Sequence, residues 1–152
     1  MYKKILVAVD GSDTSKKALD AALQMARESG GKVQLLHVVN ELGYFSGHDA
    51  YGAQITELIE LARQSGHKIL DEAIDAATAA GVAAERVSVE KFTEALGDIV
   101  SATATRLGSD LIVVGTHGRR GIGRLLLGSG AEQIIRFASV PVLVVRTSET
   151  KK

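Results

Sequence analysis

The apolar residues of this chain gather in five short runs, and longer stretches with helical spacing separate them. The runs are nearly continuous rather than alternating, and β-branched residues are frequent in them. Such runs are typical of strands that are covered on both faces, as in a parallel sheet. They occupy residues 5–9, 33–39, 87–89 with their flanks, 111–114 and 142–145. The pattern therefore predicts five short parallel strands.

The stretches between these runs carry apolar residues at intervals of three and four, which indicates amphipathic helices. We expect the first helix to end at Gly30, the long second one (residues 53–80) near Gly81 and the third at Gly108, because glycine commonly caps a helix. A fourth stripe covers residues 131–138. Strands and helices thus alternate along the whole chain.

This alternation predicts an α/β fold with right-handed crossovers and a doubly wound, five-stranded parallel sheet. We expect the strand order 3-2-1-4-5, or a close relative of it. No linker, charge block or internal repeat divides the chain. The sequence therefore predicts a single domain over residues 1–147, followed by a short tail at residues 148–152.

Composition narrows the classes of function. The 18 basic and 18 acidic side chains give a formal net charge of zero, so the overall field does not favour nucleic acid or an anionic membrane surface. No apolar stretch approaches the ~20 residues of a membrane span, and the start of the chain does not resemble a signal peptide. The absence of cysteine excludes disulfides and thiolate metal sites. We expect a cytoplasmic protein with neither a nucleic acid nor a membrane as partner.

Residues 115–130 hold six glycines, three arginines and one histidine, directly after the fourth predicted strand. In an open α/β sheet, ligands bind at the carboxyl ends of the strands, where the winding reverses. Here that point lies between the first and fourth strands, which are followed by Asp10-Gly11-Ser12 and by Gly115. The glycine-rich segment therefore lies where the topology already predicts a ligand.

The composition of this segment suits an anion. Gly115 and Gly118 permit a tight turn, and Gly128-Ser129-Gly130 opens the last helix, whose terminal N–H groups attract negative charge. A simpler alternative is that Ser129 and Glu132 form an S-x-x-E capping box, that the glycines only cap and turn, and that the arginines are solvated. No Walker motif is present, and a G-x-G-x-x-G trial from Gly121 fails at Leu126.

The spacing Gly115-x-x-Gly118, nine residues, then Gly128-Ser129 resembles the G-2x-G-9x-G-[S/T] signature of universal stress proteins that bind ATP. The resemblance covers nearly the whole chain. The segments KKILVAVDGSDTSKKAL, LLHVV, SDLIVVGTHGRRG and ASVPVLVV are similar to strands and loops of that family, in the same order. The resemblance implies an adenine nucleotide alpha hydrolase-like fold, in agreement with the prediction from periodicity.

The resemblance also implies a set of binding residues, in which the loop holds the phosphates and ribose and the second strand supplies backbone contacts to adenine. The residues that it implicates are Ala8, Val9, Asp10, Val38, Gly115, Thr116, His117, Gly118, Arg119, Arg120, Gly121, Gly128, Ser129, Gly130 and Ala131.

Two of the nearby residues have alternative interpretations. Asp10 would meet a ribose hydroxyl or a magnesium ion linked to the phosphates, or it would cap the first helix, although Ser12 and Asp13 are nearer to that task. His37 matches a histidine of the family, but a core histidine with a satisfied hydrogen bond is the favoured interpretation.

The predicted function is that of a sensor or switch that binds ATP or another adenine nucleotide (AMP, ADP or cyclic AMP) with little or no turnover. A slow ATP hydrolase is the first alternative, although Asp10 and His117 are the only nearby candidates for a base. A phosphoacceptor domain is less well supported, because it needs an aspartate at the end of the third strand and a lysine after the fifth, whereas these strands end in VEKF and VVRT. The last strand, Val142–Val145, is expected at an edge after Pro141, where it would pair with its copy in a homodimer.

Overall fold

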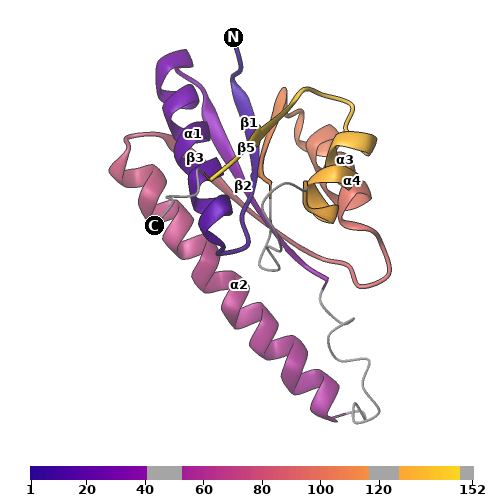
Figure 1. Ribbon diagram of the computed structural model, residues 1–152. Helices are drawn as coiled ribbons and strands as arrows, with labels where there is room; N and C mark the ends of the chain where they lie inside the picture. Colours follow the sequence, from indigo (N-terminus) through magenta and orange to yellow (C-terminus); the bar gives the residue numbers. More distant parts are fainter. Residues whose placement is uncertain (41–52, 117–126, 148–152) are drawn as a thin grey trace, which may run out of the picture.

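The computed structural model describes residues 1–40, 53–116 and 127–147, in which five strands alternate with four helices (Figure 1). The elements are β1 (Lys4–Ala8), α1 (Asp13–Ser29), β2 (Lys32–Val39), α2 (Ala53–Ala79), β3 (Ala83–Glu90), α3 (Leu96–Leu107), β4 (Leu111–Gly115), α4 (Ser129–Phe137) and β5 (Val142–Val145). The tail at residues 148–152 lies outside the described residues.

The strands form one parallel sheet in the order β3-β2-β1-β4-β5, which confirms the predicted topology. β1 lies in the centre between β2 and β4, and the switch point falls at its carboxyl end. β3 is much longer than the predicted run. The reason is that Val87 and Val89 are half-buried while Arg86 and Ser88 are exposed, so the strand alternates and a search for continuous apolar runs finds only its middle.

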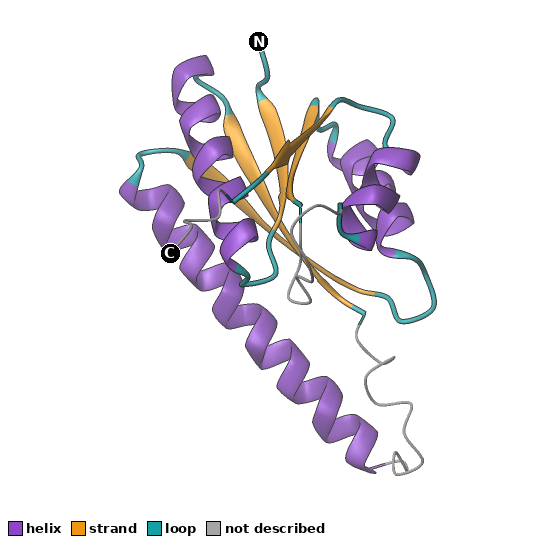
Figure 2. Ribbon diagram, viewed as in Figure 1, coloured by secondary structure: helices purple, strands orange, loops and turns teal. Residues whose placement is uncertain are grey.

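Helices cover both faces of the sheet, with α1 and α2 on one side and α3 and α4 on the other (Figure 2). Because successive strand residues point to opposite faces, each strand contributes to both cores. Ile5 and Val7 of β1 pack under α1 and α2, whereas Leu6 packs with Val100 and Ile134 from α3 and α4. No helix in the described ranges is both long enough and apolar enough to cross a membrane.

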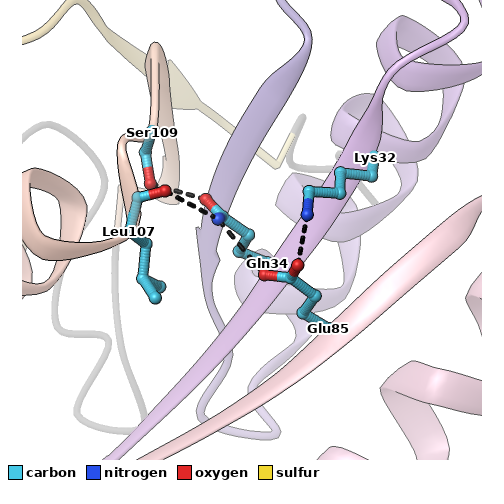
Figure 3. A network of polar contacts seen from close by, with 5 residues as sticks. All are labelled: Lys32, Gln34, Glu85, Leu107 and Ser109. Atoms are coloured by element: carbon cyan, nitrogen blue, oxygen red, sulfur yellow. Dashed lines mark hydrogen bonds and ion pairs between the residues drawn. The ribbon is translucent and has the colours of Figure 1, made fainter.

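A polar network crosses the core between the sheet and helices α3 and α4, near the amino ends of the strands (Figure 3). The side chain of Gln34 is 1% exposed; its oxygen accepts from the Ser109 hydroxyl at 2.6 Å, and its nitrogen donates to Glu85 at 3.3 Å. Glu85 also pairs with Lys32, and that hydrogen bond lowers the pKa of the Glu85 carboxyl. Because a buried amide without partners is costly, the network ties β2 to β3 and to the turn between α3 and β4.

Helix ends follow the expected chemistry. Ser12 caps α1, and its side chain accepts a hydrogen bond from the Ser15 amide at 3.2 Å. The residues that end α1 and α3 are Gly30 and Gly108, with φ values of 67° and 66°. This left-handed conformation favours glycine, so both predicted helix ends are confirmed.

Candidate functional site

The carboxyl end of β1 is held in place by a group of hydroxyl and backbone contacts. The amide of Asp10 donates to the Ser15 hydroxyl at 3.1 Å, and a carboxylate oxygen of Asp10 accepts from the Ser12 amide at 2.9 Å. Since Ser12 caps the helix, the interpretation of Asp10 as the cap is wrong. The half-buried Asp10 carboxylate is therefore fixed at the switch point without being needed to start α1.

The carboxyl end of β4 packs closely against the first turn of α1. A Cβ at Gly115 would lie 2.8 Å from the backbone carbonyl carbon and the Cβ of Thr14, closer than such atoms approach. The next residue, Thr116, donates its amide to the carbonyl of Val145 at 3.0 Å. Glycine at position 115 is thus required by packing, and this packing brings the ends of β1 and β4 together.

The start of α4 is tied to the same place. The amide of Gly128 donates to the carbonyl of Thr116 at 2.7 Å, and Gly128 is the N-cap of the helix with no side-chain hydrogen bond. Ser129 is therefore already inside the helix, and the alternative of a capping box formed by Ser129 and Glu132 is wrong.

This arrangement leaves backbone donors at the switch point. The first helical bond of α4 runs from the Glu132 amide to the Gly128 carbonyl at 3.0 Å. The amides of Ser129, Gly130 and Ala131 precede it, so the helix supplies no acceptor for them. Aligned amides and the positive end of the helix dipole together suit a phosphate or another anion.

Val38 lies where β2 extends past the end of β1. The β1–β2 register ends at the pair Ala8 and Leu36, after which the Val9 amide donates to the Leu36 carbonyl at 2.8 Å. On the other side of β2, the carbonyl of Val39 accepts from Lys91 at 3.1 Å. Because successive residues of a strand direct their backbone groups to opposite neighbours, the N–H and C=O of Val38 face the side of β1.

The burial pattern agrees with an opening at this place. Ala8 and Val38 are half-buried on the α3–α4 face of the sheet, although Val7, Leu36 and Val39 beside them are buried. The backbone groups of Val38 are therefore directed to the space beside the end of β1, next to Asp10.

His37 is a core histidine with a satisfied hydrogen bond, as one of the two interpretations predicted. The residue is 8% exposed, and its Nδ1 atom lies 2.8 Å from the carbonyl oxygen of Val9. A carbonyl only accepts, so Nδ1 carries the proton. The other side of the ring packs against α2 at Gly66, where a Cβ would lie 2.6 Å from Cδ2 of the ring.

The structure thus brings Ala8, Val9, Asp10, Val38, Gly115, Thr116, Gly128, Ser129, Gly130 and Ala131 to the carboxyl ends of β1, β2 and β4. The predicted residues His117, Gly118, Arg119, Arg120 and Gly121 lie outside the described residues. Within the described ranges, no group of three or more histidine, aspartate or glutamate side chains could hold a metal ion.

Sequence reasoning overlooked Thr14 and Ser15 as parts of this region. Both are buried, at 7% and 5% exposure, and they pack the ends of β4 and β1 against α1. The signal in the sequence is the pair of hydroxyl residues in the first turn of the helix. Serine and threonine are not favoured inside helices, so such a pair indicates that the side chains make specific contacts.

Fold and site together define a doubly wound α/β protein whose candidate site lies at the topological switch point. The model of the universal stress protein family matches residues 1–146, and the chain belongs to that family. Universal stress protein YxiE of Bacillus subtilis is 35% identical over 156 residues, covering 96% of this chain and 100% of YxiE. The family that the sequence resembles is thereby confirmed.

Solved structures of the family share the fold. A universal stress protein family member from Burkholderia pseudomallei is 33% identical with a TM-score of 0.75, over 95% of this chain and 96% of that one. A universal stress protein whose crystal structure is a complex with cAMP is 32% identical with a TM-score of 0.68, over 97% and 98% of the two chains.

Proposed function

We propose that this protein binds an adenine nucleotide at the carboxyl ends of β1, β2 and β4 and acts as a sensor or switch with little or no turnover. The observation that carries the proposal is the hydrogen bond from Gly128 to Thr116, which sets the amides of Ser129, Gly130 and Ala131 beside the end of β4. The relative solved with cAMP supports an adenine nucleotide as the ligand.

Each part of a nucleotide has a matching group. The phosphates would accept from the amides at the start of α4, with the predicted segment from His117 to Gly121 completing their site. The ribose hydroxyls would donate to Asp10, whose carboxylate is already oriented by the Ser12 amide. Adenine presents an acceptor at N1 beside a donor at N6, the complement of the N–H and C=O groups of Val38.

Magnesium is proposed only as a companion of the phosphates. A carboxylate beside a polyphosphate is repelled unless a hydroxyl or a cation lies between them. Asp10 therefore contacts either the ribose or a magnesium ion that the phosphates carry. Loss of the magnesium dependence of ATP affinity in Asp10→Asn, with AMP affinity kept, would assign Asp10 to the metal; equal weakening of ATP and AMP, with or without magnesium, would assign it to the ribose.

Calorimetry tests the binding directly. We expect ATP, ADP, AMP or cyclic AMP to bind the wild-type protein with a dissociation constant at or below the micromolar range. Gly118→Val is expected to abolish binding while the thermal unfolding temperature is kept, and Asp75→Asn, a change on the exposed face of α2, serves as the control. Absence of heat with every adenylate at millimolar concentration would refute the proposal.

The alternative function is slow hydrolysis of ATP. Turnover needs a positioned water and a group that orients it. Asp10 is engaged with the Ser12 amide, which favours a binding role for this carboxylate over that of a base. Nucleotide recovered intact after hours with protein and magnesium supports the sensor, whereas release of ADP in many turnovers would support the hydrolase.

We further propose that two copies pair through β5. This edge strand consists of four apolar residues, and Leu143 is 37% exposed on it. Ile135 and Phe137 of the neighbouring α4 are 44% and 47% exposed, so apolar area continues beyond the strand. An apolar edge with unpaired backbone groups favours pairing with an identical edge across a two-fold axis.

A further inference from the structure

We infer that His37 is a positioning residue of the nucleotide site, which ends the β1–β2 hydrogen-bond ladder and thereby leaves the backbone of Val38 available to the base. The inference rests on the proposed function for its consequence in binding, but its structural step concerns the free protein alone. It is carried by the hydrogen bond from His37 to Val9 and by the contact of His37 with Gly66.

The first step concerns the ladder. Its last bond runs from the Val9 amide to the Leu36 carbonyl, and the next rung of a parallel ladder would join the Val38 amide to the Val9 carbonyl. That carbonyl accepts the Nδ1 proton of His37 at 2.8 Å, and the strand pairing ends at the same point. The imidazole therefore competes with the Val38 amide for this carbonyl.

The second step concerns how the ring is held. His37 points to the α1–α2 face of the sheet, where its Cδ2 and Nε2 atoms lie against Gly66 in the middle of α2. Glycine in a helix interior is unfavourable relative to alanine, so its presence needs a reason. The reason here is space, because a Cβ at position 66 would lie 2.6 Å from the ring. The backbone of α2 therefore fixes the ring in the orientation that reaches Val9.

The third step concerns specificity. Guanine has a donor at N1 and an acceptor at position 6, the reverse of adenine. If the Val38 amide is kept out of the ladder, the N–H and C=O of this residue select adenine over guanine. If the ladder were to extend by one rung, the amide would be lost to Val9 and the discrimination would weaken. His37 would then determine base preference without touching the base.

The free protein provides the first test, by amide hydrogen exchange measured with NMR. We expect the Val38 amide of the wild type to exchange at least tenfold faster than the amide of Leu36, which lies inside the ladder. In His37→Leu, which keeps the volume but removes the donor, the Val38 amide should become protected. Equal protection of Val38 and Leu36 in the wild type would overturn the inference, whether or not any nucleotide binds.

Nucleotide affinity provides the second test, by calorimetry with ATP and GTP. We expect His37→Leu to weaken ATP at least tenfold and to reduce the preference for ATP over GTP. His37→Asn should restore both, because its Nδ2 lies close to the place of Nδ1 and can donate to Val9. His67→Leu, an exposed histidine of α2, is the matched control. An unchanged ATP-to-GTP ratio in His37→Leu would overturn the inference while leaving the proposed nucleotide site intact.

Discussion

The two edges of the sheet, β3 and β5, are built in opposite ways. β3 has eight residues, and its exposed face carries Arg86 and Glu90, which pair with Asp71 and Arg63 of α2. β5 has four residues, all apolar, and carries no charge. Charged side chains and a covering helix are the common means by which proteins protect an edge from pairing. The difference indicates that β3 is protected from association and that β5 is available for it.

Among the changes that test the difference between the two edges, Leu143→Lys on β5 is expected to have the largest effect, which is on dimer formation. Val144, the next residue of β5, packs against the core between the sheet and helices α3 and α4, so a charge there would also destabilise the monomer. Leu143 is exposed, and a lysine there would face its own copy across the two-fold axis. We expect the dimer dissociation constant to rise about 100-fold or more, equivalent to ~2.7 kcal/mol. Sedimentation velocity measures it, and Ser88→Lys on β3 is the control; an unchanged dimer in Leu143→Lys would place the interface elsewhere.

Gly66→Ala tests the cover over the protected side of the sheet. Helix propensity alone would make alanine better by about 1 kcal/mol. The added Cβ instead meets the ring of His37, so we expect a net loss of ~1–3 kcal/mol, as for other overpacked cores. Urea unfolding measures it. Gly81→Ala is the control for backbone strain without crowding, because Gly81 has φ 71° and a Cβ there would meet nothing within 4 Å. A stabilised Gly66→Ala protein would show that the contact with His37 is loose.

Removal of the charges on β3 should make the two edges more alike. In the double variant Arg86→Val, Glu90→Val, both ion pairs with α2 are lost and the strand presents two more apolar side chains. We expect a minor population of particles larger than the dimer at high protein concentration, detected by light scattering. A particle distribution identical to the wild type would mean that α2 alone protects this edge.

Acid should weaken the protected edge by a small amount. The hydrogen bond from Arg63 lowers the pKa of the Glu90 carboxyl below its usual range. A carboxyl with a lowered pKa in the folded state stabilises the fold above the unfolded-state pKa of about 4.3, and this contribution is lost as the pH falls through the lowered value. The stability difference between wild type and Glu90→Gln should therefore be present at pH 7 and vanish in acid. Urea titrations of both proteins across this pH range measure the difference, and a difference that persists in acid would contradict the role of the Arg63–Glu90 pair.

Much of the fold follows from the sequence, because buried parallel strands and amphipathic helices leave distinct periodicities. The limits of the elements follow less well. β1 ends at Ala8 rather than at Val9, because the Val9 carbonyl accepts from the His37 side chain and the pairing with β2 stops at Ala8, a long-range contact that no local pattern contains. The β3 strand was only partly predicted, because an edge strand that is covered on one face alternates.

For the candidate site, the sequence predicts its position but not its geometry. Gly115 was assigned to a turn around a ligand, whereas its need for glycine comes from Thr14, a neighbour about 100 residues away in the chain. Whether Ser129 caps α4 depended on where the helix begins. The structure has Gly128 as the N-cap and Ser129 as the first helical residue. The direction of the Val38 backbone required the register of β1 against β2, which no local pattern contains.

The bond between Gly128 and Thr116 has a consequence for which sequence changes the scaffold tolerates. It joins the end of β4 directly to the start of α4, so the packing of α4 on the sheet does not depend on the length of the chain between them. Doubling the length of a closed loop adds only about 0.6 kcal/mol of entropy. Changes within that stretch are therefore expected to alter ligand binding far more than the stability of the scaffold.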